Sequence, residues 1–176
     1  AIVIVFILLY LFTWASYLKE TFKDKMDTTV LSRIGVVVMI CSLAQILLGT
    51  QVRENIDEIV HQLGYGSRET WIEQLGIGFY IHRSFSLLIL ALNLFWVYKL
   101  KQVNKSEEMG TLVTTILVVL GFELMTGIIM AYFGVPAFAQ PMHLTLGILL
   151  IGLQFIVWLL INRSRFLSNP EFRSVS

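Results

Sequence analysis

Two histidines in apolar segments are the residues of this chain best placed to do chemistry. A small residue follows each of them by four positions, Ser86 after His82 and Gly147 after His143. An imidazole inside hydrocarbon is costly unless it has a partner. Two imidazoles in matching sequence contexts therefore indicate one shared ligand between two helices.

A flat metal cofactor fits this pattern, because imidazole is a common axial ligand of haem iron. Ser86 and Gly147 lie one turn after the histidines on the same helical faces, and Gly78 lies one turn before His82. These small residues leave room for a flat ring. The open alternative is two unrelated histidines, each hydrogen-bonded to a neighbouring helix. Zinc is less favoured, because no Cys, Asp or Glu completes a four-ligand set at this level.

The composition is that of a membrane protein. The 176 residues are 56% hydrophobic and 14% charged, and the mean hydropathy is +0.76. These values exclude an ordinary soluble domain. The net charge of +1 favours neither nucleic-acid binding nor an acidic partner. The single cysteine, Cys41, lies in an apolar run, so we expect a small buried side chain and no disulfide within the chain.

Five apolar stretches approach or exceed the length of about 20 residues that a membrane span needs. They cover residues 1–18, 30–50, 71–98, 111–133 and 141–161. The first is short, and because it begins inside an apolar run we expect it to be the end of a helix of a longer protein. The third is long enough to tilt or to project beyond the membrane. With these bounds the two histidines enter at different depths, so packing must bring them level.

The four later stretches form an internal repeat. The segment 45–49 (Gln-Ile-Leu-Leu-Gly) resembles 123–127 (Glu-Leu-Met-Thr-Gly), and the stretch after each carries a histidine. This order predicts a pseudo-two-fold axis along the membrane normal. The predicted fold is an all-α transmembrane four-helix bundle built from two parallel two-helix repeats, preceded by one partial span. The predicted domains are 1–18, the last span of a preceding unit, and 19–176, the bundle.

Three further charged residues are candidates for polar contacts. Arg53 follows the second stretch, where its guanidinium suits either a haem propionate or a pair with Glu54 or lipid headgroups. Arg83 is expected to be buried and to need a propionate or a carboxylate such as Glu73 or Glu123. Glu123 lies well inside its stretch, but its repeat counterpart is a neutral glutamine. We therefore expect Glu123 to make a polar contact rather than to transfer protons.

These residues together resemble the haem A synthase family. Residues 45–54 (QILLGTQVRE) look like that family's helix-end motif, and the His82-Arg83 pair with the stretch from Pro136 to His143 is similar to the histidine helices of one of its halves. The resemblance covers nearly the whole chain. It implies eight spans in two similar halves. The N-terminal half oxidises the methyl group of haem O to the formyl group of haem A, and the C-terminal half holds a b-type haem.

Two departures place this chain within that family. The catalytic half has a glutamate three residues before its first histidine, whereas this chain has Phe79, and the cysteine pair of many members is absent from the outer loop. The resemblance therefore implies the C-terminal, haem-b half, preceded by the last helix of the catalytic half. It makes His82 and His143 the axial ligands of the haem iron, places Arg53 and Arg83 near the propionates, and leaves no catalytic residue in this chain.

The implied full-length protein is an oxidoreductase that uses molecular oxygen. Haem b is the implied cofactor of this half, and haem O the substrate of the other. The implied partners are the lipid bilayer, the N-terminal half of the same protein, a haem O supplier and a terminal oxidase, with no nucleic acid. One rival is a stand-alone b-type membrane electron-transfer cytochrome, and another is a haem-free assembly factor or transporter bundle. In each case we expect an integral membrane protein, in the bacterial plasma membrane.

A charge bias in the links predicts the orientation in the membrane. Basic residues gather at the first and third links and after the last stretch: Lys19, Lys23, Lys25, Arg33, Lys99, Lys101, Lys105, Arg163, Arg165 and Arg173. Residues 51–70 carry only two arginines against four acidic residues. Because positive residues stay in the cytoplasm, we predict a cytoplasmic C-terminus and an external 51–70 loop.

Cysteine labelling in intact cells tests this orientation. A membrane-impermeant thiol reagent should label a cysteine introduced at Ser67 and should not label one introduced at Ser174. Labelling at Ser174 with none at Ser67 would reverse the topology.

Overall fold

The computed structural model describes residues 2–17, 29–103 and 106–166, all within helices, turns or short links. In chain order the helices are α1 (Ile2–Tyr17), α2 (Thr29–Leu63), the 3-10 helix η1 (Tyr65–Thr70), α3 (Ile77–Val103), α4 (Glu107–Tyr132), α5 (Ala139–Ile161) and α6 (Arg163–Phe166). The helices α2, α3, α4 and α5 are long and apolar enough to cross a membrane, which confirms the all-α transmembrane class. With 16 residues, α1 is apolar but shorter than a span.

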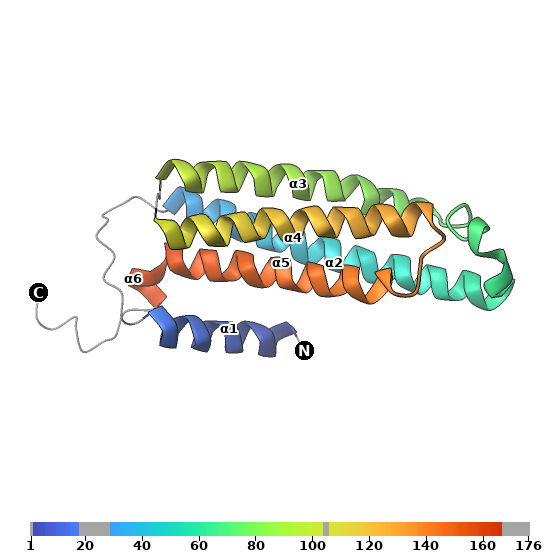
Figure 1. Cartoon of the computed structure of the whole chain (residues 1–176), viewed down its shortest axis with the longest axis horizontal. Coiled ribbons are helices and arrows are strands. Elements are labelled where there is room, and N and C mark those ends of the chain that lie inside the picture. Colours follow the sequence, from blue (N-terminus) through green and yellow to red (C-terminus); the bar gives the residue numbers. More distant parts are fainter. Residues whose placement is uncertain (1, 18–28, 104–105, 167–176) are drawn as a thin grey trace, which may run out of the picture.

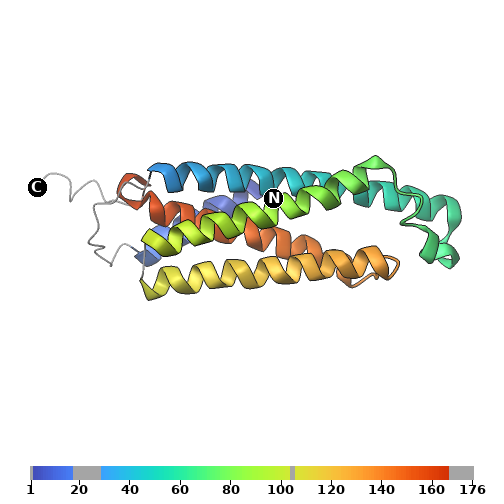
Figure 2. The same cartoon turned by 90° about the horizontal axis from the view of Figure 1, so that it is seen from above.

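The four long helices lie side by side along one axis (Figure 1). Both α2 and α4 contact α3 and α5, so the four helices form a closed ring, and α1 packs outside it against α5 (Figures 1 and 2). The pseudo-two-fold axis stays a prediction. The proposed domain boundary at residue 18 lies outside the described residues, as do Lys19, Lys23, Lys25, Lys105 and Arg173.

Two predicted boundaries at one end of the bundle are wrong. The second stretch was expected to end at Thr50, but α2 continues to Leu63. The third was expected to begin at Trp71, but residues 71–76 form turns and irregular chain, and α3 begins at Ile77. At about 1.5 Å per residue, the 35 residues of α2 span about 52 Å, against roughly 30 Å of hydrocarbon. The helix α2 therefore projects further beyond the hydrocarbon than α3, whose 27 residues span about 40 Å.

The projecting part of α2 is the base of a cap, defined as residues 51–76, which extends past the ends of α4 and α5 (Figures 1 and 2). Val52 and Ile56 are buried one turn apart, while charged residues beside them stay exposed. This amphipathic pattern continues the helix after the apolar stretch has ended. Trp71 and Leu75 of the cap pack with Val52 and Ile56 of α2 and with Val135 of the α4–α5 loop. These five residues form a small core that is separate from the main one.

Two buried amides connect opposite corners of the helix ring. Gln154 Nε2 on α5 donates to Asn93 Oδ1 on α3 at 2.9 Å, and both side chains are 0% exposed. Asn93 Nδ2 in turn donates to the main-chain oxygen of Ile89 at 2.9 Å. Hydrogen bonds between membrane helices contribute about 0.6 kcal/mol each on average. The Gln154–Asn93 bond therefore adds little to the free energy of unfolding, and its main effect is to set the register of α3 against α5.

Gly35 marks the closest approach of α2 to its neighbours. A Cβ at this position would lie 2.7 Å from Trp96 Cζ2 and 3.2 Å from Trp158 Cδ1. The Trp96 indole is fully buried, and its Nε1 donates to Leu31 O at 3.0 Å. It cannot move aside without breaking that bond, so this contact requires glycine.

Replacing Gly35 with alanine should lower the free energy of unfolding by about 1–3 kcal/mol, the usual cost of overpacking. The measurement is unfolding of the purified protein in mixed micelles, followed by tryptophan fluorescence. Gly121→Ala is the matched control, because Gly121 is also helical and nothing lies within 4 Å of its Cβ position. The control should be unchanged or gain about 0.5–1 kcal/mol. Equal stability of the two variants would contradict the close contact at Gly35.

Candidate functional site

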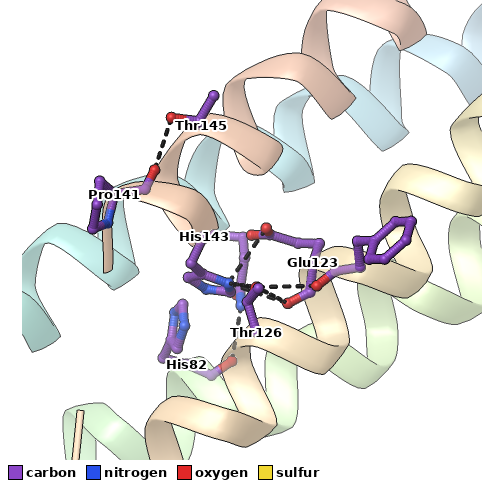
Figure 3. A network of polar contacts seen from close by, with 8 residues as sticks. His82, Glu123, Thr126, Pro141, His143 and Thr145 are labelled. Atoms are coloured by element: carbon purple, nitrogen blue, oxygen red, sulfur yellow. Dashed lines mark hydrogen bonds and ion pairs between the residues drawn. The ribbon is translucent and has the colours of Figure 1, made fainter. Parts of the chain in front are cut away.

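The two histidines of the repeat lie together inside the bundle. Their ring centres are 6.4 Å apart, and their planes are inclined by 77° (Figure 3). His82 lies five residues after Ile77, the first residue of α3, and His143 lies four after Ala139, the first of α5. The late start of α3 therefore removes the difference in depth that the sequence suggested. Both imidazoles enter about one turn below the cap.

Each imidazole packs against a glycine of the preceding long helix. A Cβ at Gly49 on α2 would lie 3.2 Å from His82 Cε1, and one at Gly127 on α4 would lie 3.3 Å from His143 Cε1. These glycines end the repeated segments 45–49 and 123–127. The repeat thus produces the same contact twice. Sequence reasoning missed this role, although the shared final glycine of the two segments was the available signal.

The Nδ1 atom of His143 is held by α4. It lies 3.0 Å from Thr126 Oγ1 and 3.1 Å from the main-chain oxygen of Glu123, with Glu123 Oε2 at 3.3 Å (Figure 3). A main-chain oxygen only accepts hydrogen bonds, so Nδ1 carries the proton. The Nε2 atom then has a free lone pair. A neutral imidazole anchored through Nδ1–H is the usual form of a metal-binding histidine.

His82 is anchored through its backbone instead of its ring. Gln45 Nε2 on α2 donates to the main-chain oxygen of His82 at 3.1 Å. The His82 Nδ1 atom is buried and has no hydrogen-bond partner among the described residues. The two imidazoles therefore differ in what surrounds the ring, although they occupy matching places in the repeat.

The small residues near the histidines differ from the expectation that all three leave room for a ring. A Cβ at Gly147 would lie 3.3 Å from Glu123 Oε1, so this glycine makes room for the carboxylate. Ser86 Oγ donates to Arg83 O within its own helix at 2.6 Å. Gly78 has nothing within 4 Å of its Cβ position. Gly78 therefore borders open space, whereas Gly147 does not.

The two predicted arginines lie on the surface of the bundle. Arg53 is half-exposed and forms an ion pair with Asp57, one turn further along α2, rather than with Glu54. Arg83 is exposed, so the expectation that it is buried is wrong. With His82 facing inward, the next residue is turned by about 100° around the helix. In the described part of the chain, no carboxylate forms an ion pair with Arg83, and Glu123 lies against His143 instead.

The geometry of the imidazole pair fits one shared iron atom. Two metal–nitrogen bonds of about 2 Å each, together with the radii of the two rings, place the ring centres roughly 6 Å apart. The observed 6.4 Å agrees with that separation. Within residues 2–17, 29–103 and 106–166 no group of three or more His, Cys, Asp or Glu is placed to hold a metal ion. The glycine beside each ring is a further feature that suits bound imidazoles.

Comparison with known proteins agrees with the resemblance carried by these residues. The model of a cytochrome oxidase assembly protein family, COX15-CtaA, matches residues 1–155, which include both histidines. The curated proteins give no match to the chain, and neither do the solved structures. Since the family match covers most of the chain, this protein belongs to the cytochrome oxidase assembly protein family, which is the haem A synthase family.

Proposed function

We propose that this chain is the C-terminal, haem-b-binding half of a haem A synthase, with His82 and His143 as the two ligands of the iron. The observation that carries the proposal is the pair of level imidazoles with ring centres 6.4 Å apart. Membership of the family supplies the setting, which is haem A synthesis for cytochrome oxidase assembly.

The residues around the imidazoles hold them ready to bind. Thr126 and the main-chain oxygen of Glu123 keep the proton of His143 on Nδ1 and leave Nε2 free. Gly49 and Gly127 let each ring lie against the neighbouring helix. A bound haem supplies reversible one-electron transfer. With both histidines bound to the iron, no iron position would be left for oxygen, so this half would pass electrons rather than oxidise substrate.

Arg53 and Arg83 are the proposed partners of the haem propionates. Arg83 follows His82 directly, and Arg53 lies one turn beyond Gly49, which touches the His82 ring. Both guanidinium groups are exposed at the end of the bundle that carries the imidazoles. Planar guanidinium groups bind carboxylates through two parallel hydrogen bonds. Arg53 would then share its charge between a propionate and Asp57.

Substrate oxidation is assigned to the other half of the full-length protein. Phe79 stands where the catalytic half of the family carries a glutamate, and its ring packs against the core of the cap. An aromatic hydrocarbon cannot accept or donate protons as a general acid or base. The proposed partners are accordingly the N-terminal half, a haem O supplier and a terminal oxidase.

The charges of the described residues support a bacterial plasma-membrane orientation with the cap outside. Arg33 lies near the start of α2, Lys99 and Lys101 near the end of α3, and Arg163 at the start of α6; these helix ends lie opposite the cap (Figure 1). In the cap, Glu54, Asp57 and Glu58 of α2 are exposed. Cytoplasmic retention of positive residues places the Arg/Lys-rich end inside.

Replacing either ligand should abolish the low-spin bis-histidine haem spectrum, because the iron then loses one axial nitrogen. His82→Ala and His143→Ala are compared with the parent protein by visible absorption and electron paramagnetic resonance. His61→Ala is the matched control, since His61 is an exposed histidine in the cap. The control should keep the parent spectrum. Parent spectra in both ligand variants would disprove the proposed ligation.

Phe79→Leu should leave haem O conversion by the full-length enzyme nearly unchanged, because both side chains are apolar and neither reacts. The rate should fall less than about tenfold, which corresponds to about 1.4 kcal/mol of activation free energy. Product haem A and bound haem are measured on the same samples. A collapse of turnover with normal haem content would contradict this division of labour between the halves.

A further inference from the structure

The two imidazoles are not equivalent, although the helices that carry them are repeats. His143 Nδ1 has Thr126 Oγ1 at 3.0 Å and Glu123 O at 3.1 Å, both from α4. His82 Nδ1 is equally enclosed but has no partner in the described residues. Figure 3 shows the dashed contacts that end on the ring of His143 and none that ends on the ring of His82.

Part of the difference has a single-residue origin in the repeat, because one of the two acceptors on α4 is the Thr126 side chain and the other is the main-chain oxygen of Glu123. Alignment of 45–49 with 123–127 places Leu48 opposite Thr126. A leucine has no oxygen to accept a proton from the ring beside it. The amide of Gln45, opposite Glu123, donates to the main-chain oxygen of His82. Neither residue of α2 therefore contributes an acceptor to His82 Nδ1.

An acceptor on Nδ1–H strengthens the bond that the opposite nitrogen makes to a metal. It fixes the proton on Nδ1, holds the ring in one orientation and raises the basicity of Nε2. Loss of such a partner commonly costs about 10- to 100-fold in metal affinity. A buried N–H without an acceptor is also unfavourable in itself. Both effects favour His143 over His82.

We propose that His143 is the strong ligand and His82 the weak, exchangeable one, with Thr126 as a positioning residue that contributes to the difference. This inference rests on the proposed haem ligation. In this proposal α4 and α5 retain the haem, and the bond between the iron and His82 is the first to open.

The two single-ligand variants test the order of strength. Haem content is measured after purification, and haem release is followed as transfer to excess apomyoglobin. His82→Ala should keep its haem as a high-spin species bound to His143, and His143→Ala should release haem about 10- to 100-fold faster than His82→Ala. Equal release from both variants would overturn the inequality while leaving the ligation intact. Parent low-spin spectra in both would instead disprove the ligation itself.

Variants that keep both histidines test the role of Thr126. Thr126→Val should speed haem release and shift the low-spin resonance signal, because valine has nearly the same shape without the hydroxyl. Thr126→Ser should restore the parent values. Leu48→Thr should slow the release, since it places a hydroxyl at the equivalent position beside His82. The same release rates in the valine and serine variants, or no slowing in Leu48→Thr, would overturn the assignment.

Discussion

The pairing of polar groups inside an apolar helix ring is the constraint on which this structure depends. A polar group in hydrocarbon costs free energy unless it has a partner. The Asn93–Gln154 bond meets this demand across the ring, and the Nδ1 contacts of His143 meet it between α4 and α5. Each such contact joins two helices and favours one register between them, because a hydrogen bond depends on direction more strongly than apolar packing does. The helices reach their register through their few polar side chains.

Close backbone approach makes those contacts possible. Gly35 admits the Trp96 indole, while Gly49 and Gly127 admit the two imidazoles. Small residues at helix interfaces are typical of membrane bundles, where association relies on close packing rather than on exclusion of water. In this chain the glycines are placed where a large ring from the next helix needs space. Glycine therefore makes room for the Trp96 indole near one end of the bundle and for the two imidazoles near the other.

The sequence predicted the four spans, the class of fold and the meeting of His82 with His143, because apolar length and repeated spacing are encoded locally. It did not predict that α2 continues into the cap. The change from apolar to amphipathic residues near Thr50 resembles the end of a membrane span, because the sequence does not show which residues the later part of the helix packs against. The exposure of Arg83 and the role of Thr126 also escaped prediction. The contact of Thr126 with His143 depends on how α4 is rotated against α5, which no local pattern specifies, whereas the outward position of Arg83 follows from the helical step after His82.

The cap has its own small core, and the buried residues of that core are separate from those of the main one. Regions with separate cores open as separate cooperative units, at a lower free energy than global unfolding. Phe79 packs into the cap core three residues before His82, so an opening of the cap loosens the first turn of α3. Hydrogen exchange at that turn is therefore expected to follow the stability of the cap. Stabilising the cap core should then slow exchange at the turn before His82, with the rest of the four long helices unchanged.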